Sequence, residues 1–246
     1  HIKVHEVIFE FAKDIFGVDD LSKILLDADV DGNNALQLAT RHRGENIVRA
    51  LIENIKSSVS NDACKEIIQA LDSDVGDNVF ALAAWNAENQ GLFTVLWDFA
   101  KEKLNLKEAK VLIQKKNKFS NNVLSVLVAK NNHKSLNELL HLLKNDFSQE
   151  ELKAFLNEED EWNRDFFNAL AIDENDTTCL DIFWDFSRSL FEENELKDMV
   201  RGKDWKAIHH VFDRENDLVA KKFLAITEEL FDEAELKEIL QIYYSK

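Results

Sequence analysis

The chain has 246 residues, of which 45% are hydrophobic, and it contains no proline and only six glycines. β-Sandwiches and dinucleotide-binding enzymes need Gly and Pro for tight turns and phosphate loops, so this composition excludes them and favours helices joined by short polar connections. The formal net charge of −17 repels phosphate backbones and anionic lipid surfaces, so neither nucleic acid nor a membrane is an expected partner.

Apolar residues recur along the chain with a period near 44 residues. One register is a pair of adjacent apolar residues at Leu51-Ile52, Val95-Leu96, Leu139-Leu140, Ile182-Phe183 and Phe223-Leu224. A second register is Leu21, Cys64, Ala109, Leu152, Leu196 and Leu236. Two independent registers that share one period indicate internal repeats. We interpret the chain as one repeat array with units of approximately residues 1–26, 27–70, 71–114, 115–157, 158–201 and 202–246.

Each unit is predicted to hold three short helices. A partial unit opens the chain with a second-type helix at Val7. The first helices of the later units are expected at Ala35–Arg41, Val79–Trp85, Val123–Ala129, Phe166–Ile172 and Ala207–Asp213. A second helix follows at each apolar pair. The chain is expected to reverse just before it, at the equivalent positions Gly44, Glu88, Asn132, Asn175 and Asn216. The Gly and Asn residues among them tolerate the left-handed backbone that ends a helix and reverses the chain. The third begins near a Leu-Lys pair, with capping patterns such as Ser148 with Glu151. Helix groups at a fixed period predict an all-α fold, a solenoid of about five repeats.

The segment Asp31–Ala39 reads Asp-Gly-Asn-Asn-Ala-Leu-Gln-Leu-Ala, which resembles the ankyrin signature of a turn followed by Thr-Pro-Leu-His-Leu-Ala. The resemblance continues through Gly44 to Leu51-Ile52. The period exceeds the usual ankyrin length by about ten residues, which we assign to an added third helix. Extended units of this kind resemble those of arthropod proteins and of bacteria that live with arthropods. The resemblance implies a stacked helical array whose usual role is protein binding.

The same segment contains the first half of a calcium-loop pattern. Alternating oxygen ligands and a glycine turn are found at Asp27, Asp29, Asp31 and Gly32. Leu38 occupies the position of the closing bidentate glutamate, and an ankyrin-like turn explains the Asp-Gly pair without an ion. We therefore expect no metal site.

Other chemistry-bearing residues give no recognisable site. His209 and His210 are adjacent and would diverge by about 100° on a helix. Cys64 and Cys179 are too few for a disulfide framework and too far apart for a metal motif. We expect free thiols, no catalytic residue and no cofactor. Since no long apolar run or signal peptide is present, a cytoplasmic protein is expected.

The aromatic residues suggest where a partner binds. Those on the second helices are expected to pack in the core, at Trp97, Phe99, Trp184 and Phe186. Others occupy the turn before a first helix, where they either fold back on the neighbouring unit or serve as exposed binding anchors. The candidate partner-binding set consists of these aromatics with charged neighbours: Phe119, Trp162, Trp205, Lys116, Lys118 and Asp160.

The sequence thus predicts a scaffold that binds a protein through its concave face and turn tips, rather than an enzyme. One alternative is the targeting arm of a larger enzyme, toxin or bacterial effector whose catalytic part lies elsewhere. Another is a self-associating spacer. The terminal helices lack the polar outer face that ends a repeat array, so we expect an excerpt of a longer array that could self-associate through these ends.

Overall fold

The computed structural model describes residues 15–86, 90–159, 165–172, 176–202, 211 and 217–244. Within these ranges all regular secondary structure is α-helical, and no β-strand is present, which confirms the expected all-α class. The chain divides into two compact units, His1–Lys130 and Asn131–Lys246. Among the described helices, none combines the length and the apolar character needed to cross a membrane.

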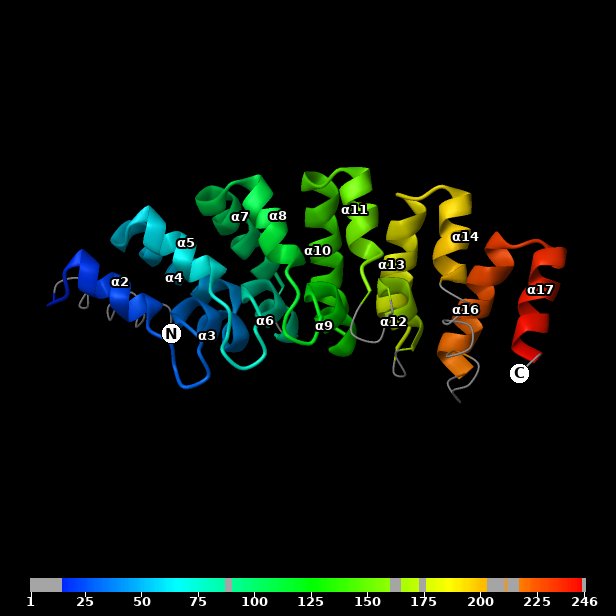
Figure 1. Cartoon of the computed structure of the whole chain (residues 1–246), viewed down its shortest axis with the longest axis horizontal. Helices are drawn as coiled ribbons and strands as arrows, with labels where there is room; N and C mark the ends of the chain where they lie inside the picture. The colour runs from blue at the N-terminus through cyan, green and yellow to red at the C-terminus, as the bar shows by residue number, and fades with distance from the viewer. Residues whose placement is uncertain are drawn as a thin grey trace. The chain divides into compact units, whose positions relative to one another are not determined.

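The first unit contains α2 (Val18–Leu26), α3 (Ala35–His42), α4 (Glu45–Ser58), α5 (Asn61–Gln69), α6 (Val79–Trp85), α7 (Leu92–Leu104), α8 (Leu106–Gln114) and α9 (Val123–Ala129). The short helices α3, α6 and α9 pack side by side in that order (Figure 1). Helix α4 packs on α7, which also contacts α5 and α8. The first-helix ranges expected from sequence match α6 and α9 and differ from α3 by one residue.

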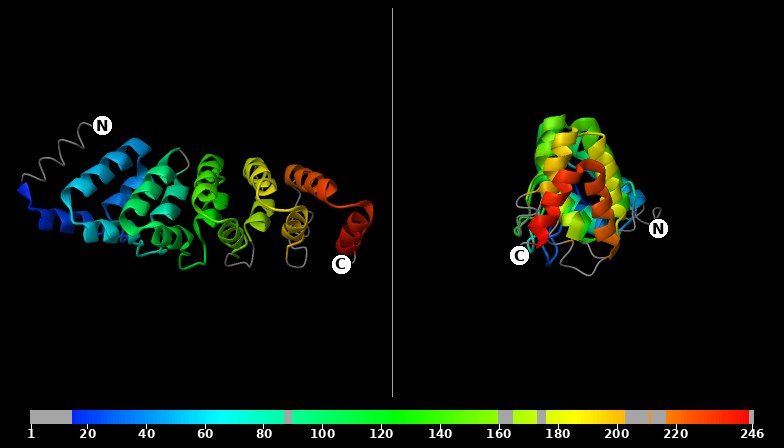
Figure 2. Two further views of the ribbon diagram at one scale, coloured as in Figure 1. Left: turned by 90° about the horizontal axis from the view of Figure 1, so that it is seen from above. Right: turned by 90° about the vertical axis from the view of Figure 1, so that its right-hand side faces the viewer.

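The second unit contains α10 (His133–Asp146), α11 (Gln149–Leu156), α12 (Phe166–Ile172), α13 (Thr178–Arg188), α14 (Glu193–Arg201), α16 (Asp217–Leu230) and α17 (Glu233–Tyr244). Helix α13 packs on α10 and α12, and α16 packs on α12 and α14 (Figure 2). The expected helix at Val7 lies outside the described residues, as does the one at Ala207–Asp213 apart from Val211.

Asparagine caps fix where the short helices begin. Asn34, Asn78 and Asn122 precede α3, α6 and α9, and each Oδ1 accepts one or two N–H groups of the first helical turn. The amide Nδ2 of Asn34 also donates to the carbonyl oxygen of Ile67 at 2.9 Å, and that of Asn78 to Leu112 at 2.7 Å. One buried side chain therefore starts a first helix and ties it to the end of a third helix.

The predicted left-handed reversals are wrong at Gly44 and Asn132. Gly44 has φ −79 and ψ 163, and Asn132 has φ −87. Both are N-cap residues, and an N-cap takes non-helical backbone so that the following helix can start. Left-handed backbone occurs instead at Asn131 and Gly91. The other predicted reversals, Glu88, Asn175 and Asn216, lie outside the described residues.

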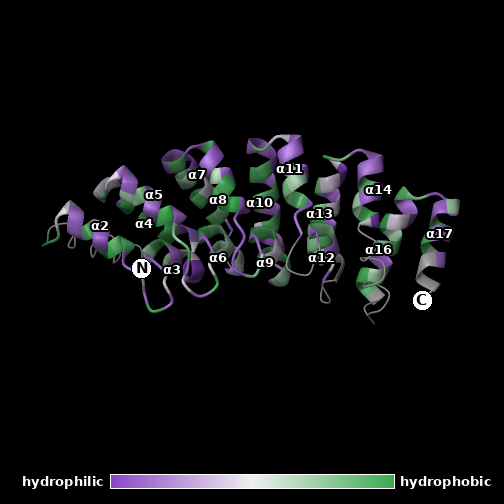
Figure 3. Cartoon of the chain, in the orientation of Figure 1, coloured by the Kyte–Doolittle hydropathy of each residue, from purple (hydrophilic) through white to green (hydrophobic). Residues whose placement is uncertain are grey.

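The core of each unit is built on aromatic side chains. In the first unit Phe80 stacks on Phe93, with ring centroids 6.4 Å apart, and meets Trp97 edge-on at 6.1 Å. Figure 3 colours α6 and α9 as hydrophobic along most of their length. A helix that is apolar on all sides is expected to be buried, and Val79 to Ala84 of α6 are all buried. Only the last residue, Trp85, is exposed.

The second-helix aromatics behave mostly as predicted. Trp97, Phe99 and Trp184 are 0%, 2% and 3% exposed, so they belong to the core. Phe186 is half-buried instead, and Lys144 Nζ lies 5.9 Å from its ring centroid. The core assignment therefore holds for three of the four.

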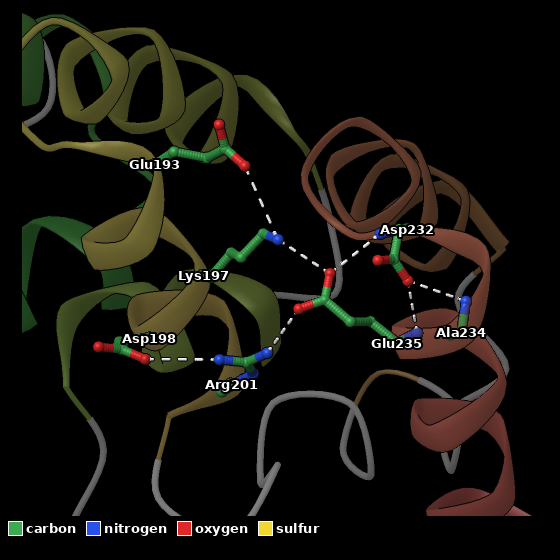
Figure 4. Close-up of polar contacts among 7 residues, drawn as sticks. All are labelled: Glu193, Lys197, Asp198, Arg201, Asp232, Ala234 and Glu235. Atoms are coloured by element: carbon green, nitrogen blue, oxygen red, sulfur yellow. Dashed lines mark hydrogen bonds and ion pairs between the residues drawn. The ribbon is translucent and has the colours of Figure 1, made fainter.

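Ion pairs join α14 to α17 (Figure 4). Glu235 of α17 lies with Oε2 2.8 Å from Lys197 Nζ and with Oε1 2.9 Å from an Arg201 Nη atom. Its carboxylate also accepts the N–H of Asp232 at 3.0 Å, which completes the cap of α17. The hydrogen bond from Lys197 is the main cause that lowers the pKa of Glu235.

Candidate partner-binding surface

The loops before α3, α6 and α9 share one construction. In each, a single side chain accepts two or more backbone N–H groups, and these side chains are Asp29, Asp72 and Asn117. In the first loop Asp29 Oδ1 lies 3.0 Å from Asp31 N and 2.9 Å from Asn33 N. The N–H of Asn33 is the main cause that lowers the pKa of Asp29. Asp29, one of the carboxylates of the calcium-loop pattern, therefore stabilises the turn to which it belongs.

Adjacent loops are hydrogen-bonded to one another. Ser73 N donates to the carbonyl of Asp31 at 3.1 Å, and Lys118 N donates to that of Val75 at 2.9 Å. Gly32 fits this arrangement because its φ of 80° is left-handed and a Cβ there would lie 2.5 Å from Ser73 N. The turn tips thus form a continuous, ordered edge on the first unit.

Three of the six residues proposed for partner binding lie in this edge, and all three are exposed. Phe119 at the tip of its loop is 52% exposed. Lys118 is partly committed to structure, because its Nζ donates to the carbonyl oxygens of Ser73 at 2.6 Å and Asp74 at 2.8 Å. Lys116 is the third. The remaining three, Asp160, Trp162 and Trp205, lie outside the described residues.

A second exposed aromatic lies at the end of α6. Trp85 is 41% exposed, although every residue before it in α6 is buried. The cap residue Asn86 holds this end in place, since its Nδ2 donates to the carbonyl oxygens of Thr40 at 2.9 Å and Arg43 at 3.0 Å. The carboxyl-terminal ends of α3 and α6 are therefore fixed side by side.

Two cationic groups lie against the Trp85 ring. Lys130 Nζ, at the end of α9, is 3.6 Å from the ring centroid, and the guanidinium carbon of Arg41 in α3 is 6.0 Å from it. Both distances are within the range of cation–π attraction. Three helix ends thus contribute one residue each to an exposed aromatic and cationic patch, which we call the Trp85 patch: Arg41, Trp85 and Lys130.

A buried carboxylate supports the Trp85 patch from below. Asp77 is 3% exposed; its Oδ2 accepts the indole N–H of Trp85 at 3.2 Å, and its Oδ1 accepts the amide of Asn117 at 2.8 Å. Burial raises the pKa of Asp77, against the smaller opposing effect of these hydrogen bonds. Since Asn117 Oδ1 also accepts the N–H of Phe119, Asp77 connects the Trp85 patch to the loop tip.

The interpretation of the sequence did not single out Trp85, Arg41 or Lys130. One signal was available: Arg41 and Trp85 are equivalent last positions of their predicted helices, and Lys130 directly follows the equivalent Ala129. At the ends of these three helices the sequence thus places a tryptophan between two basic residues, whereas the preceding positions of the same helices are mainly apolar.

Other features of the described residues offer less for binding or chemistry. No group of three or more His, Cys, Asp or Glu side chains in these ranges is arranged to hold a metal ion. Cys64 and Cys179 are free and buried, and burial raises the pKa of the Cys64 thiol, which makes it a poorer nucleophile. A depression of about 530 Å³ lies along α8 and is lined by Gln69, Asn105, Lys107, Glu108, Val111, Leu112 and Lys115.

Comparisons with protein-family models, with curated proteins and with solved structures find no match to this chain.

Proposed function

We propose that the chain is an ankyrin-like helical repeat array that binds a protein partner through the face carrying the ends of its first helices and through its turn tips. The proposal concerns protein rather than nucleic acid, because the net charge of −17 opposes binding of a polyanion. It assigns binding to this chain and no catalytic step.

Equivalent contacts at the predicted period support the repeat interpretation. The Asn34–Ile67 and Asn78–Leu112 hydrogen bonds join equivalent positions 44 and 45 residues apart. In the second unit, ion pairs between successive third helices recur in the same way, at Lys153–Glu195 and Lys197–Glu235. In a solenoid each repeat contacts its neighbours through the same residues, so recurring contacts of this kind are expected.

The observation that carries the binding proposal is the exposure of Trp85 on a rigid support. Its indole N–H is fixed by Asp77, and the helix ends around it are tied together by Asn86. Exposed tryptophans that become buried in an interface are common anchors of protein binding. A ring that is already held in place loses less conformational entropy on association than a mobile one.

The proposal is tested by selecting binders from a phage-displayed library of random peptides with the whole chain as bait. Selected peptides should bind Trp85→Ala at least about thirtyfold more weakly, since truncating an anchor tryptophan commonly costs about 2 kcal/mol or more. Val111→Ala is the matched control, because Val111 is also exposed (63%) in the first unit but lies on α8. Circular dichroism confirms that each variant remains folded.

Two results would contradict the proposal. If the library yields no peptide that binds the folded chain, a peptide-binding function is rejected. If all selected peptides bind Trp85→Ala and the wild-type chain equally well, the binding surface lies elsewhere and the role given to the Trp85 patch is wrong.

A further inference from the structure

The Trp85 patch is basic, whereas the chain as a whole carries a formal net charge of −17. The chain carries 47 acidic against 30 basic side chains, and three of its described arginines pair with glutamates: Arg49, Arg188 and Arg201. Arg41 and Lys130, in contrast, have no carboxylate oxygen within 4 Å among the described residues. An acidic protein therefore presents two basic groups, unpaired with any described carboxylate, beside one exposed aromatic ring.

Arg41 acts at long range on two described carboxylates, Asp29 and Asp77, and forms an ion pair with neither. Asp77 is buried beneath Trp85, and its two oxygens accept the indole N–H and the Asn117 amide. Arg41 acts on Asp77 only through a small long-range attraction, without a hydrogen bond. The positive charge at the surface thus remains available to groups that approach from solvent.

We infer that the Trp85 patch binds an acidic segment of a partner protein, in which carboxylates pair with Lys130 and Arg41 and an apolar side chain packs against the exposed part of the indole ring. The inference rests on the proposed protein-binding function and adds the chemistry of the partner. Complementary charge across an interface fixes the register of the bound chain and speeds association. The ring provides the apolar contact area that charge pairing alone lacks.

A short acidic segment fits this surface better than nucleic acid does. Bases can stack on tryptophan, and phosphates can pair with Lys and Arg. A site for single-stranded nucleic acid, however, combines such rings with a positively charged groove that follows the backbone over several nucleotides. The Trp85 patch has one ring and two cations, which match the few carboxylates of a short acidic segment. A segment of a few residues meets mainly the local charges, because attraction and repulsion between exposed groups are screened beyond about 8–10 Å at physiological salt.

The test uses a fluorescein-labelled peptide of repeated Glu-Glu-Leu triplets, a counterpart in which every Glu is Gln, and a single-stranded oligothymidine. Binding to the whole chain is followed by fluorescence anisotropy. The Glu peptide is expected to bind, and the Gln peptide to bind at least about tenfold more weakly. Lys130→Gln and Arg41→Gln should each weaken the Glu peptide about two- to fivefold, the range for one exposed ion pair. Lys65→Gln, an equal charge change on exposed α5, should leave the affinity unchanged.

Each contrary result has a defined meaning. Equal binding of the Glu and Gln peptides, or equal weakening by Lys65→Gln and Lys130→Gln, overturns the inference of an acidic partner. So does an absence of Glu-peptide binding at about 1 mM, the weak end of measurable affinity. Tighter, Lys130-dependent binding of oligothymidine assigns the patch to nucleic acid instead. The proposed function is judged separately by the library selection, because selected peptides that need Trp85 but lack acidic residues would uphold it while rejecting the inference.

Discussion

Replacing Asn78 by alanine tests whether the asparagine caps join helices as well as start them. Asn78 is 2% exposed, its Oδ1 accepts the N–H groups of Phe80 at 2.9 Å and Ala81 at 3.0 Å, and its Nδ2 donates to Leu112 O at 2.7 Å. Asn78→Ala removes all three hydrogen bonds at once. It therefore weakens the start of α6 and leaves the carbonyl of Leu112 without this partner.

The expected loss is larger than that of an ordinary cap. Removing an N-cap side chain costs about 1 kcal/mol. A buried carbonyl that loses its hydrogen bond adds about 1–3 kcal/mol, because it was already removed from water. Together the free energy of unfolding should fall by about 2–4 kcal/mol, measured by urea denaturation with far-ultraviolet circular dichroism.

Ser60→Ala is the matched control. Ser60 caps α5 through one hydrogen bond, from Ala63 N to its Oγ at 3.2 Å, and it is exposed. Its loss should therefore cost about 1 kcal/mol or less. If Asn78→Ala is no more destabilising than Ser60→Ala, the hydrogen bond to Leu112 contributes nothing, and the reasoning that joins first and third helices through Asn78 is refuted.

Two carboxyl groups should give pH effects of opposite sign. Burial raises the pKa of Asp77, so the folded state holds that proton more tightly than the unfolded chain, and its contribution to stability falls as pH rises from the unfolded towards the folded pKa. The stability of Asp77→Asn relative to wild type should therefore rise with pH across this window. The hydrogen bond from Lys197 lowers the pKa of Glu235, so its contribution is present above the unfolded pKa and is lost as pH falls through the folded one. Glu235→Gln should destabilise the chain at neutral pH, and its difference in stability from wild type should vanish on acidification. Urea denaturation midpoints of both variants and of wild type, measured from acidic to neutral pH, check the two predictions. A stability difference that changes with pH in the opposite direction would contradict the prediction for that variant.

The sequence predicted the all-α class and the positions of the described first helices because two physical signals coincide there. In α6, a buried asparagine cap is followed at once by an unbroken apolar run from Val79 to Ala84. Capping fixes the start of the helix, and burial on all sides keeps it short and apolar. Where only one signal was used, as at Gly44, the backbone was mispredicted. Glycine permits both left-handed and extended backbone, so its presence does not decide between them: Gly44 before α4 is extended, whereas Gly91 before α7 is left-handed.

The candidate surface was predictable only in part. Phe119 was found because it replaces a turn aspartate, and a large apolar residue at a turn tip is conspicuous in any sequence. The role of Lys118 was hidden, because its contacts with the carbonyls of Ser73 and Asp74 come from another loop, far away in sequence. Trp85 was hidden for a different reason. Since α6 is apolar throughout, its periodicity does not distinguish the one position that faces solvent from those that face the core.

Hydrogen bonds connect Trp85 and Phe119, two exposed aromatics of the first unit. Trp85 donates to Asp77, Asp77 accepts from Asn117, and Asn117 accepts from the N–H of Phe119. Burial of Asp77 disfavours the charged form of its carboxyl group. An apolar residue at this position, however, would leave the indole N–H of Trp85 and the amide N–H of Asn117 without this acceptor. The same buried group therefore orients the ring at the end of α6 and supports the loop that carries Phe119. Residues in one hydrogen-bonded network do not act independently. The Trp85 patch and the turn tip that carries Phe119 are therefore better regarded as one surface than as two.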